Sequence, residues 1–272
     1  MSWGVQVRNA SVSWGNAFNL VVGGLKLDSN QISGRLPVLG RSGSGKSTLL
    51  YLLTFLKRPS EGSVRWSFPD GHRAVWGPNG LDGQESTLDL TQIRRQCFGF
   101  AYQNSTLTPY LRVRENLRYP LELLGGFSKT EMDRRVHAAM DRVLLRDDLG
   151  ARVEDTSPEE FLDRYPNELS GGQFQRVALA QAMIHDPHVL FADEPTGNLD
   201  ADTRQEVMGL VDRWLAKGDR MVIWVTHHRS DAIDPRVSHW LMVANNRCLL
   251  RLKGGKKSNS PGESDSASLM AG

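Results

Sequence analysis

The apolar residues of this chain follow two kinds of pattern. Residues 113–124 and 129–145 carry apolar positions at helical spacing, with charged residues between them. Elsewhere the apolar residues form short continuous runs, which are typical of strands buried on both faces of a parallel sheet. Together the two patterns predict an α/β core with a helical block, about residues 104–180, inserted into it. The continuous runs lie at residues 36–39, 98–102, 188–192 and 221–226.

Other segments predict short strands or no regular structure. Polar and apolar residues alternate within residues 3–27, and this alternation predicts strands there. Residues 240–243 and 248–252 predict two closing strands. Residues 67–90 are rich in Gly, Pro, Asp and Asn, so we expect a surface loop with at most short strands. Residues 253–272 contain few apolar residues and are expected to form a disordered tail.

Composition narrows the class of protein only modestly. The chain has 272 residues, 39% of them hydrophobic and 24% charged, which suits one globular unit or a core with a subdomain. A net charge of +2 does not favour a nucleic-acid partner. Cys97 and Cys248 lie in no metal-ligand spacing, which favours two reduced thiols. No apolar run approaches the roughly 18 residues of a membrane span, so a partner must provide any link to a membrane.

Residues 40–48, Gly-Arg-Ser-Gly-Ser-Gly-Lys-Ser-Thr, match the phosphate-binding P-loop pattern. A strand is predicted before them and a helix after them, which is the context that this motif requires. Glycines let the backbone approach a phosphate, and the successive N–H groups form an anion site at the start of the helix. Pro37 lacks an N–H, so the preceding strand is expected to begin late or to be distorted. The residues expected to bind the phosphates of a nucleotide are Gly40, Arg41, Ser42, Gly43, Ser44, Gly45, Lys46, Ser47 and Thr48, with Lys46 at the β- and γ-phosphates and Ser47 on Mg²⁺.

Polar side chains end three of the predicted strands, where a parallel sheet presents its ligand crevice. Gln103 follows the second run and could contact Mg²⁺ and an attacking water. Asp193 can hold Mg²⁺ and Glu194 can act as a general base, because both follow the third run. His227 follows the fourth run and could bond a γ-phosphate, whereas His228 is expected to be solvated.

Two further segments each allow a functional and a structural interpretation. Ser170-Gly171-Gly172-Gln173 starts a predicted helix, so it is either a second anion site or only a helix cap. Asp200 can cap the following helix, residues 201–217. Trp14 lies upstream of the P-loop and could stack on a nucleotide base, with Phe18 as the alternative, or it could simply pack.

Taken together, and in the order in which they occur along the chain, these motifs resemble those of the ATP-binding cassette (ABC) ATPases. The resemblance covers about residues 3–252. The resemblance identifies residues 40–48 as Walker A, Gln103 as the Q-loop residue, Leu169–Gln173 as the signature, Val189–Glu194 as Walker B, Asn198–Asp200 as the D-loop and His227 as the switch histidine.

Two segments narrow the resemblance to a subgroup. Glu194–Asp200 and Tyr165–Glu168 resemble the subgroup that contains the lipoprotein-releasing LolD, the macrolide-exporting MacB and the cell-division protein FtsE. Four positions differ from the pattern usual there, and none of them carries a catalytic group: Arg35, Phe174, Gln181 and His228.

The resemblance implies an α/β P-loop NTPase fold, with a RecA-like core, an antiparallel β subdomain and a helical signature subdomain, in one ABC ATPase domain, residues 1–252. It implies hydrolysis of ATP with Mg²⁺ by in-line attack of water. It also implies a homodimer of cassettes, in which the signature of one protomer and Asp200 close over ATP on the other. The partner would be an integral membrane permease, and the chain would be peripheral on the cytoplasmic face of the inner membrane.

Three alternatives belong to other functional classes. A mechanotransmission ATPase would move cell-envelope or cell-wall partners without transport, as the resemblance to FtsE suggests. A soluble ABC protein of DNA repair or translation usually carries tandem cassettes, coiled-coil insertions or zinc modules, which we do not find here. A small-molecule kinase with a P-loop would not explain Gln103 and the Ser170–Gln173 motif.

Overall fold

The structure is a computed structural model, and it describes residues 3–15, 18–29, 32, 34–102, 107–143, 157–197 and 199–253. Its strands are β1 (Gly4–Trp14), β2 (Phe18–Val22), β3 (Leu25–Asp28), β4 (Arg35–Leu39), β5 (Glu61–Ser67), β6 (Arg73–Gly77), β7 (Gly80–Leu81), β8 (Phe98–Ala101), β9 (Val189–Asp193), β10 (Met221–Val225), β11 (His239–Ala244) and β12 (Arg247–Leu252). In the described residues they form one sheet, in the order β7-β6-β5-β1-β2-β12-β11-β4-β10-β9-β8, with β3 paired to β1. The predicted tail lies outside the described residues, apart from Lys253.

One half of the sheet is parallel and contains the four continuous apolar runs. β10 lies between β4 and β9, and β8 pairs with the other edge of β9. β11 adds a further parallel strand beside β4. All five residues of β10 are buried, as are four of the five in β9, which is why these segments carry no polar alternation. The prediction of an α/β core built on these runs is confirmed.

The expectation that Pro37 delays or distorts its strand is wrong. β4 begins at Arg35 and pairs with β10 through Pro37, which lies opposite Trp224. Backbone bonds to β10 use Gly34 O and Val38 O, so the nitrogen of residue 37 faces the other neighbour, β11. Pairing with β11 starts only at Val38. A central strand therefore tolerates this proline because no ladder partner stands opposite its missing N–H.

The other half of the sheet is antiparallel. β1 pairs with β2, β3 and β5, which confirms the strands predicted within residues 3–27. In the segment predicted as a loop, β6 and the two-residue β7 extend this edge. This segment is followed by a helix that was not predicted, α2 (Leu90–Gln96), which Asp89 caps by accepting the N–H of Gln92 at 2.8 Å. Only Ile93 of this short helix is buried, so it carries no periodic apolar pattern.

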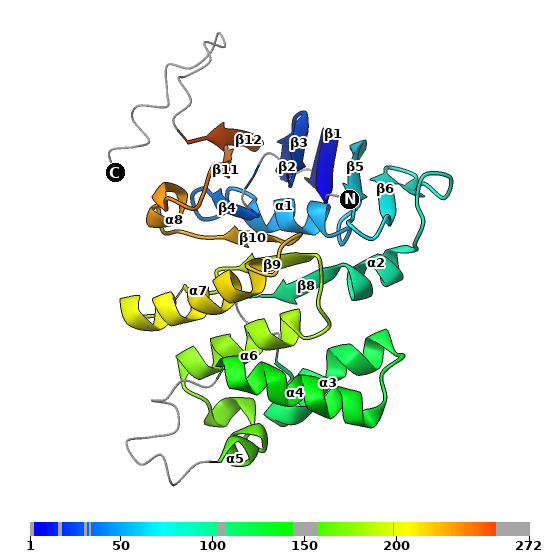
Figure 1. Cartoon of the computed structure of the whole chain (residues 1–272). Helices are drawn as coiled ribbons and strands as arrows, with labels where there is room; N and C mark the ends of the chain where they lie inside the picture. Colours follow the sequence, from blue (N-terminus) through cyan, green and yellow to red (C-terminus); the bar gives the residue numbers. More distant parts are fainter. Residues whose placement is uncertain are drawn as a thin grey trace.

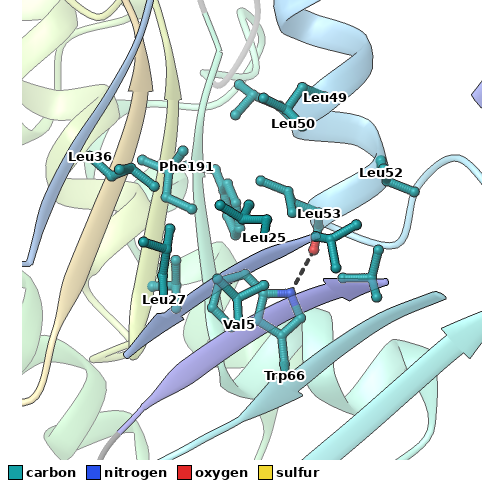
Figure 2. Close-up of a cluster of buried hydrophobic side chains, with 14 of the residues drawn as sticks. Val5, Leu25, Leu27, Leu36, Leu49, Leu50, Leu52, Leu53, Trp66 and Phe191 are labelled. Carbon is teal, nitrogen blue, oxygen red and sulfur yellow. Dashed lines mark hydrogen bonds between the residues drawn. The ribbon is translucent and has the colours of Figure 1, made fainter. Parts of the chain in front are cut away.

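Helix α1 (Lys46–Leu53) follows the P-loop and packs between the two halves of the sheet. Figure 2 shows Leu49, Leu50 and Leu53 of α1 facing strands that are distant in the sequence. The indole N–H of the fully buried Trp66 donates to Leu53 O at 2.9 Å, where α1 ends. This hydrogen bond attaches the antiparallel half to the helix that carries the P-loop.

The inserted block forms its own apolar cluster. Its helices are α3 (Val113–Leu124), α4 (Lys129–Val143), α5 (Pro158–Leu162), the 3₁₀ turn η2 (Pro166–Glu168) and α6 (Gly171–Met183). They lie at the end of the molecule opposite β1 and β3 (Figure 1). Phe174 packs against this cluster, and the buried Gln181 donates to Asn116 O of α3 at 3.0 Å. Phe174 and Gln181, two of the positions that differ from the subgroup pattern, thus join α6 to its neighbours.

A third cluster joins α6 to α7 (Ala201–Leu215), with the parallel strands beneath them. The short α8 (Ser230–Ile233) follows β10. Arg35, another unusual position, pairs with Asp212 of α7 at 2.6 Å. Within the residues that the structure describes, no helix combines the length and the apolar character needed to span a bilayer.

Candidate functional site

The P-loop joins β4 to α1 and has the backbone shape that its glycines allow. Gly43 and Gly45 have φ values of 72° and 101°, which side chains other than glycine rarely adopt. A Cβ at Gly45 would lie 2.6 Å from Cζ of Phe18, so this position is also too close to β2 for any side chain. The loop leads directly into the N-terminus of α1, where the backbone N–H groups favour an anion.

The side chain of Lys46 folds back over this loop. Its Nζ donates to Gly40 O at 3.1 Å and to Arg41 O at 3.0 Å. Burial lowers the pKa of Lys46, while the carboxylates of Glu194 and Asp193 oppose that shift. The ammonium group is thus held beside two acidic groups at the start of α1.

Ser47, in the first turn of α1, contacts Asp193. The Ser47 hydroxyl donates to Oδ2 of Asp193, the last residue of β9, at 2.8 Å. Burial raises the pKa of Asp193; the bond from Ser47 opposes this and the nearby Glu194 adds to it. A hydroxyl and a carboxylate oxygen are hard ligands of the kind that Mg²⁺ takes together with phosphate and water. In the part of the chain that is described, no group of three or more His, Cys, Asp or Glu side chains is arranged to hold a metal ion by itself.

Glu194 is held in an uncommon backbone conformation beside His227. Its φ is +50°, which few residues other than glycine adopt. Its N–H donates to Val225 O at 3.1 Å, and its C=O accepts from Gly197 N at 3.1 Å, so the turn is fixed on both sides. Nε2 of His227 contacts Oε1 of Glu194. The Glu194 side chain is mostly buried, whereas that of His227 is half exposed.

These groups surround one pocket of about 410 Å³. Two aromatic side chains at its edge come from the hairpin of β1 and β2, in which Trp14 is paired with Phe18. Nζ of Lys57 lies 4.1 Å from the ring centroid of Trp14, so a cation covers one face of the indole. The lining consists of Trp14, Phe18, Ser42, Gly43, Gly45, Lys46, Ser47, Thr48, Asp193, Glu194, Val225 and His227.

The second predicted anion site does not line this pocket. The Ser170 hydroxyl caps α6 by accepting the N–H of Gln173 at 3.3 Å, and Oε1 of Gln173 accepts the N–H of Ser170 in return. Asp200 caps α7 as predicted, accepting the N–H and the hydroxyl of Thr203 at 3.0 and 2.7 Å. The hydrogen bonds from Thr203 lower the pKa of Asp200. In this protomer both residues therefore act as helix caps.

The two capped helices lie directly against each other. A Cβ at Gly172 would lie 2.5 Å from Cγ2 of Thr203, so glycine permits the close approach of α6 to α7. The nearly buried Arg176 of α6 pairs with Glu206 of α7 at 3.0 Å. The N-termini of α6 and α7 thus form one surface with two helix caps.

Several contacts in these sites have no clear signal in the sequence. Thr203 and the Arg176–Glu206 pair lie within helical patterns, and Lys57 lies in a turn. Gln103 and Asn198 were predicted at the site, and both lie outside the described residues. Ser44, Gly40 and Arg41 belong to the P-loop but do not line the pocket, the last two supplying the carbonyls that hold Lys46.

Comparisons with known proteins identify a family and several relatives. The family model described as ABC transporter matches residues 25–197. The macrolide export ATP-binding/permease protein MacB of Syntrophobacter fumaroxidans is 38% identical over 200 residues, which are 72% of this chain and 24% of that protein. The lipoprotein-releasing system ATP-binding protein LolD 1 of Chlorobium chlorochromatii is 37% identical over 199 residues, 72% of this chain and 70% of that protein. The chain thus spans about a quarter of the first relative's length and most of the second's.

Solved structures show the same fold. The dimeric structure of MJ0796, called a bacterial ABC transporter cassette, matches with a TM-score of 0.70 and 28% identity, covering 93% of this chain and all of that one. A second dimeric structure of MJ0796, in a post-hydrolysis state bound to ADP and Pi, matches with a TM-score of 0.69, 28% identity and the same coverage. The predicted fold class is therefore confirmed.

The close approach of α6 to α7 gives a stability prediction. Gly172→Ala should destabilise the chain by about 1–3 kcal/mol, although alanine normally favours a helix, because its methyl group must displace Thr203. Thr203→Ser removes the obstructing Cγ2 and keeps the hydroxyl that bonds Asp200. The double variant should therefore recover most of the loss in denaturant unfolding. A single variant as stable as the parent would contradict the observed packing.

Proposed function

This chain belongs to the ABC transporter family, and we propose on that premise that it is an ATPase subunit that energises a separate membrane permease. The observation that carries the proposal is the single pocket into which P-loop, Asp193, Glu194 and His227 converge from distant parts of the chain. The permease would be of the lipoprotein-release or macrolide-export type, as the names of the relatives suggest.

We propose a role for each polar group of the pocket. The backbone N–H groups of the P-loop and the ammonium group of Lys46 would bind the phosphates of ATP. Ser47 and Asp193 would hold Mg²⁺, together with Gln103. Bound Mg²⁺ would neutralise phosphate charge during the transfer. Glu194 would accept a proton from the attacking water, and His227, already in contact with that carboxylate, would orient it and bond the γ-phosphate.

The signature would act on the nucleotide of a second protomer. Ser170, Gly171, Gly172 and Gln173 stand at a helix N-terminus that does not line the pocket of its own protomer. Asp200 caps the neighbouring helix, so the two would reach a partner together. A two-fold dimer would use each patch reciprocally. The dimeric structures of MJ0796 support this arrangement.

The same proposal gives the domain limits and the location of the chain. Residues 1–252 would form the ABC ATPase domain, in which residues 104–180 are the helical subdomain. The chain would be peripheral on the cytoplasmic side of the cell membrane, attached through its permease. Its cofactors would be ATP and Mg²⁺, and no nucleic acid would be bound.

Glu194→Gln should bind ATP and turn it over at least ~10²-fold more slowly, because it removes the proposed base and keeps its size. Phosphate release measures the turnover. Glu61→Gln, an exposed change on β5, is the matched control and should keep parental activity.

The same variant tests the dimer. With ATP and Mg²⁺ the Glu194→Gln protein should accumulate as a dimer in light scattering, and with ADP it should dissociate. Adding Ser170→Arg should abolish the dimer. Near-parental turnover by Glu194→Gln would refute the assignment of the base.

We further propose that Trp14 stacks on the adenine. Trp14→Ala should weaken ATP binding about tenfold or more, because stacking of a base on an aromatic side chain is worth roughly 1–3 kcal/mol. Trp14→Phe is the conservative control and should retain most of the affinity, measured by calorimetric titration. Equal affinity of the alanine variant and the parent, with unchanged circular dichroism, would mean that Phe18 or no side chain stacks on the adenine.

The segment between Gln103 and α3 is the proposed contact of the permease. Tyr110 in this segment is 86% exposed. Cys97 and Cys248 are both buried, and burial raises the pKa of each thiol to about 12, so an introduced cysteine is the reactive one. Tyr110→Cys should crosslink to an integral membrane protein in native membranes, whereas Leu252→Cys, exposed on β12, should not. Capture of soluble proteins alone would argue against a permease partner.

A further inference from the structure

The structure contains a second hollow, which shares no lining residue with the nucleotide pocket. It is a cleft of about 450 Å³ between α4, the C-terminal part of α6 and the C-terminal part of α7. Figure 1 shows these three helices stacked in the order α7, α6, α4. The cleft lies where the apolar cluster of the inserted block meets the cluster that joins α6 and α7 to the sheet.

The inner surface of this cleft is apolar. The small side chains of Ala138, Ala139 and Ala180 leave room between the helices, and larger side chains surround the hollow. Trp214 of α7 is 5% exposed, and the guanidinium of Arg220 lies 5.2 Å from its ring centroid, so this wall is fixed in place. The apolar lining includes Ala138, Ala139, Ala180, Met183, Ile184 and Leu210.

The charged part of the lining is mostly cationic. Arg134, Arg135, Arg213 and Lys217 contribute four positive groups, and Asp186 contributes one carboxylate. The carboxylate of Asp186 forms ion pairs with Lys217, at an N–O distance of 3.7 Å, and with Arg220, which lies outside the lining. Glu131, also outside the lining, bonds both arginines of α4 at 2.8 to 2.9 Å. These carboxylates offset part of the positive charge, and the lining itself stays positive.

We propose that this cleft binds a small organic anion with a hydrocarbon chain, such as a fatty-acid carboxylate. An apolar interior removes the hydrocarbon from water, and the cations beside it attract and bond the carboxylate. The volume lies in the range of about 300–1,000 Å³ that is typical of small-molecule sites. A cationic amphiphile of the same length would meet like charges, so the charge of the lining selects the sign of the ligand.

The position of the cleft gives its occupant a structural effect. α6 begins after Ser170 and α7 begins after Asp200, and both helices run from these caps to the cleft. An occupant would contact both helices and α4 at once. Because it binds the folded chain and not the unfolded one, it should raise the temperature of unfolding with its concentration.

The test uses the full chain and decanoate below its micelle concentration, with decyltrimethylammonium as the probe of opposite charge. Calorimetric titration should show one decanoate site, and thermal unfolding should shift upward with decanoate alone. Arg213→Glu/Lys217→Glu should weaken decanoate binding about tenfold or more, because both changes reverse charges at the cleft. Arg8→Glu, a single exposed charge reversal on β1 away from the cleft, is the control and should bind like the parent.

Ala138→Phe supplies a second variant, which fills the hollow without changing charge and should also weaken decanoate binding. Weaker binding in both cleft variants, with parental binding in Arg8→Glu, supports the proposal. Absence of decanoate binding by the parent would overturn it. Equal binding of the two amphiphiles, or decanoate binding that neither cleft variant alters, would also overturn it, since the ligand would then lie elsewhere.

Discussion

The parallel register of β4, β10 and β9 is the constraint on which the nucleotide pocket depends. It brings the carboxyl ends of these strands to one edge, so that Ser47 donates to Asp193, which is 146 residues away in the sequence. The same edge receives Glu194 and His227, which touch although they follow different strands. A slip of one residue in either pairing would turn the alternate side chains to the opposite face of the sheet. The continuous burial of β9 and β10 opposes such a slip on both faces.

The charges of Lys46, Asp193 and Glu194 determine the electrostatic balance of this pocket. Two adjacent carboxylates at the end of a buried strand are unfavourable without a cation nearby. Lys46 supplies one positive charge beside the two carboxylates, and burial lowers the pKa of Lys46 and raises that of Asp193. We propose that Mg²⁺ supplies further positive charge beside these carboxylates, while the anion-binding N–H groups of the P-loop bind the phosphates.

The helical block presents the proposed partner-facing surface, which is positioned by the packing of helices and not by strand register. Gly172 lets α6 approach Thr203, and Arg176 bonds Glu206, so the caps Ser170 and Asp200 stand side by side. The opposite ends of the same two helices line the cationic cleft. One helix pair thus connects the proposed partner-facing surface with the proposed site for an organic anion, which places both within a single packed unit.

The sequence by itself determined the parallel strands, the P-loop, the acidic strand end and the helix caps at Ser170 and Asp200. Each of these is a local signal: an apolar run, a glycine spacing or a capping residue followed by a helix. It did not determine that Pro37 would sit inside a central strand, because that depends on where β11 begins to pair. Nor did it reveal α2, the packing of Phe18 on Gly45 or the cleft lined by α4, α6 and α7. These features depend on which residues from separate elements come within contact distance, and only the packing of the sheet and the helices fixes that.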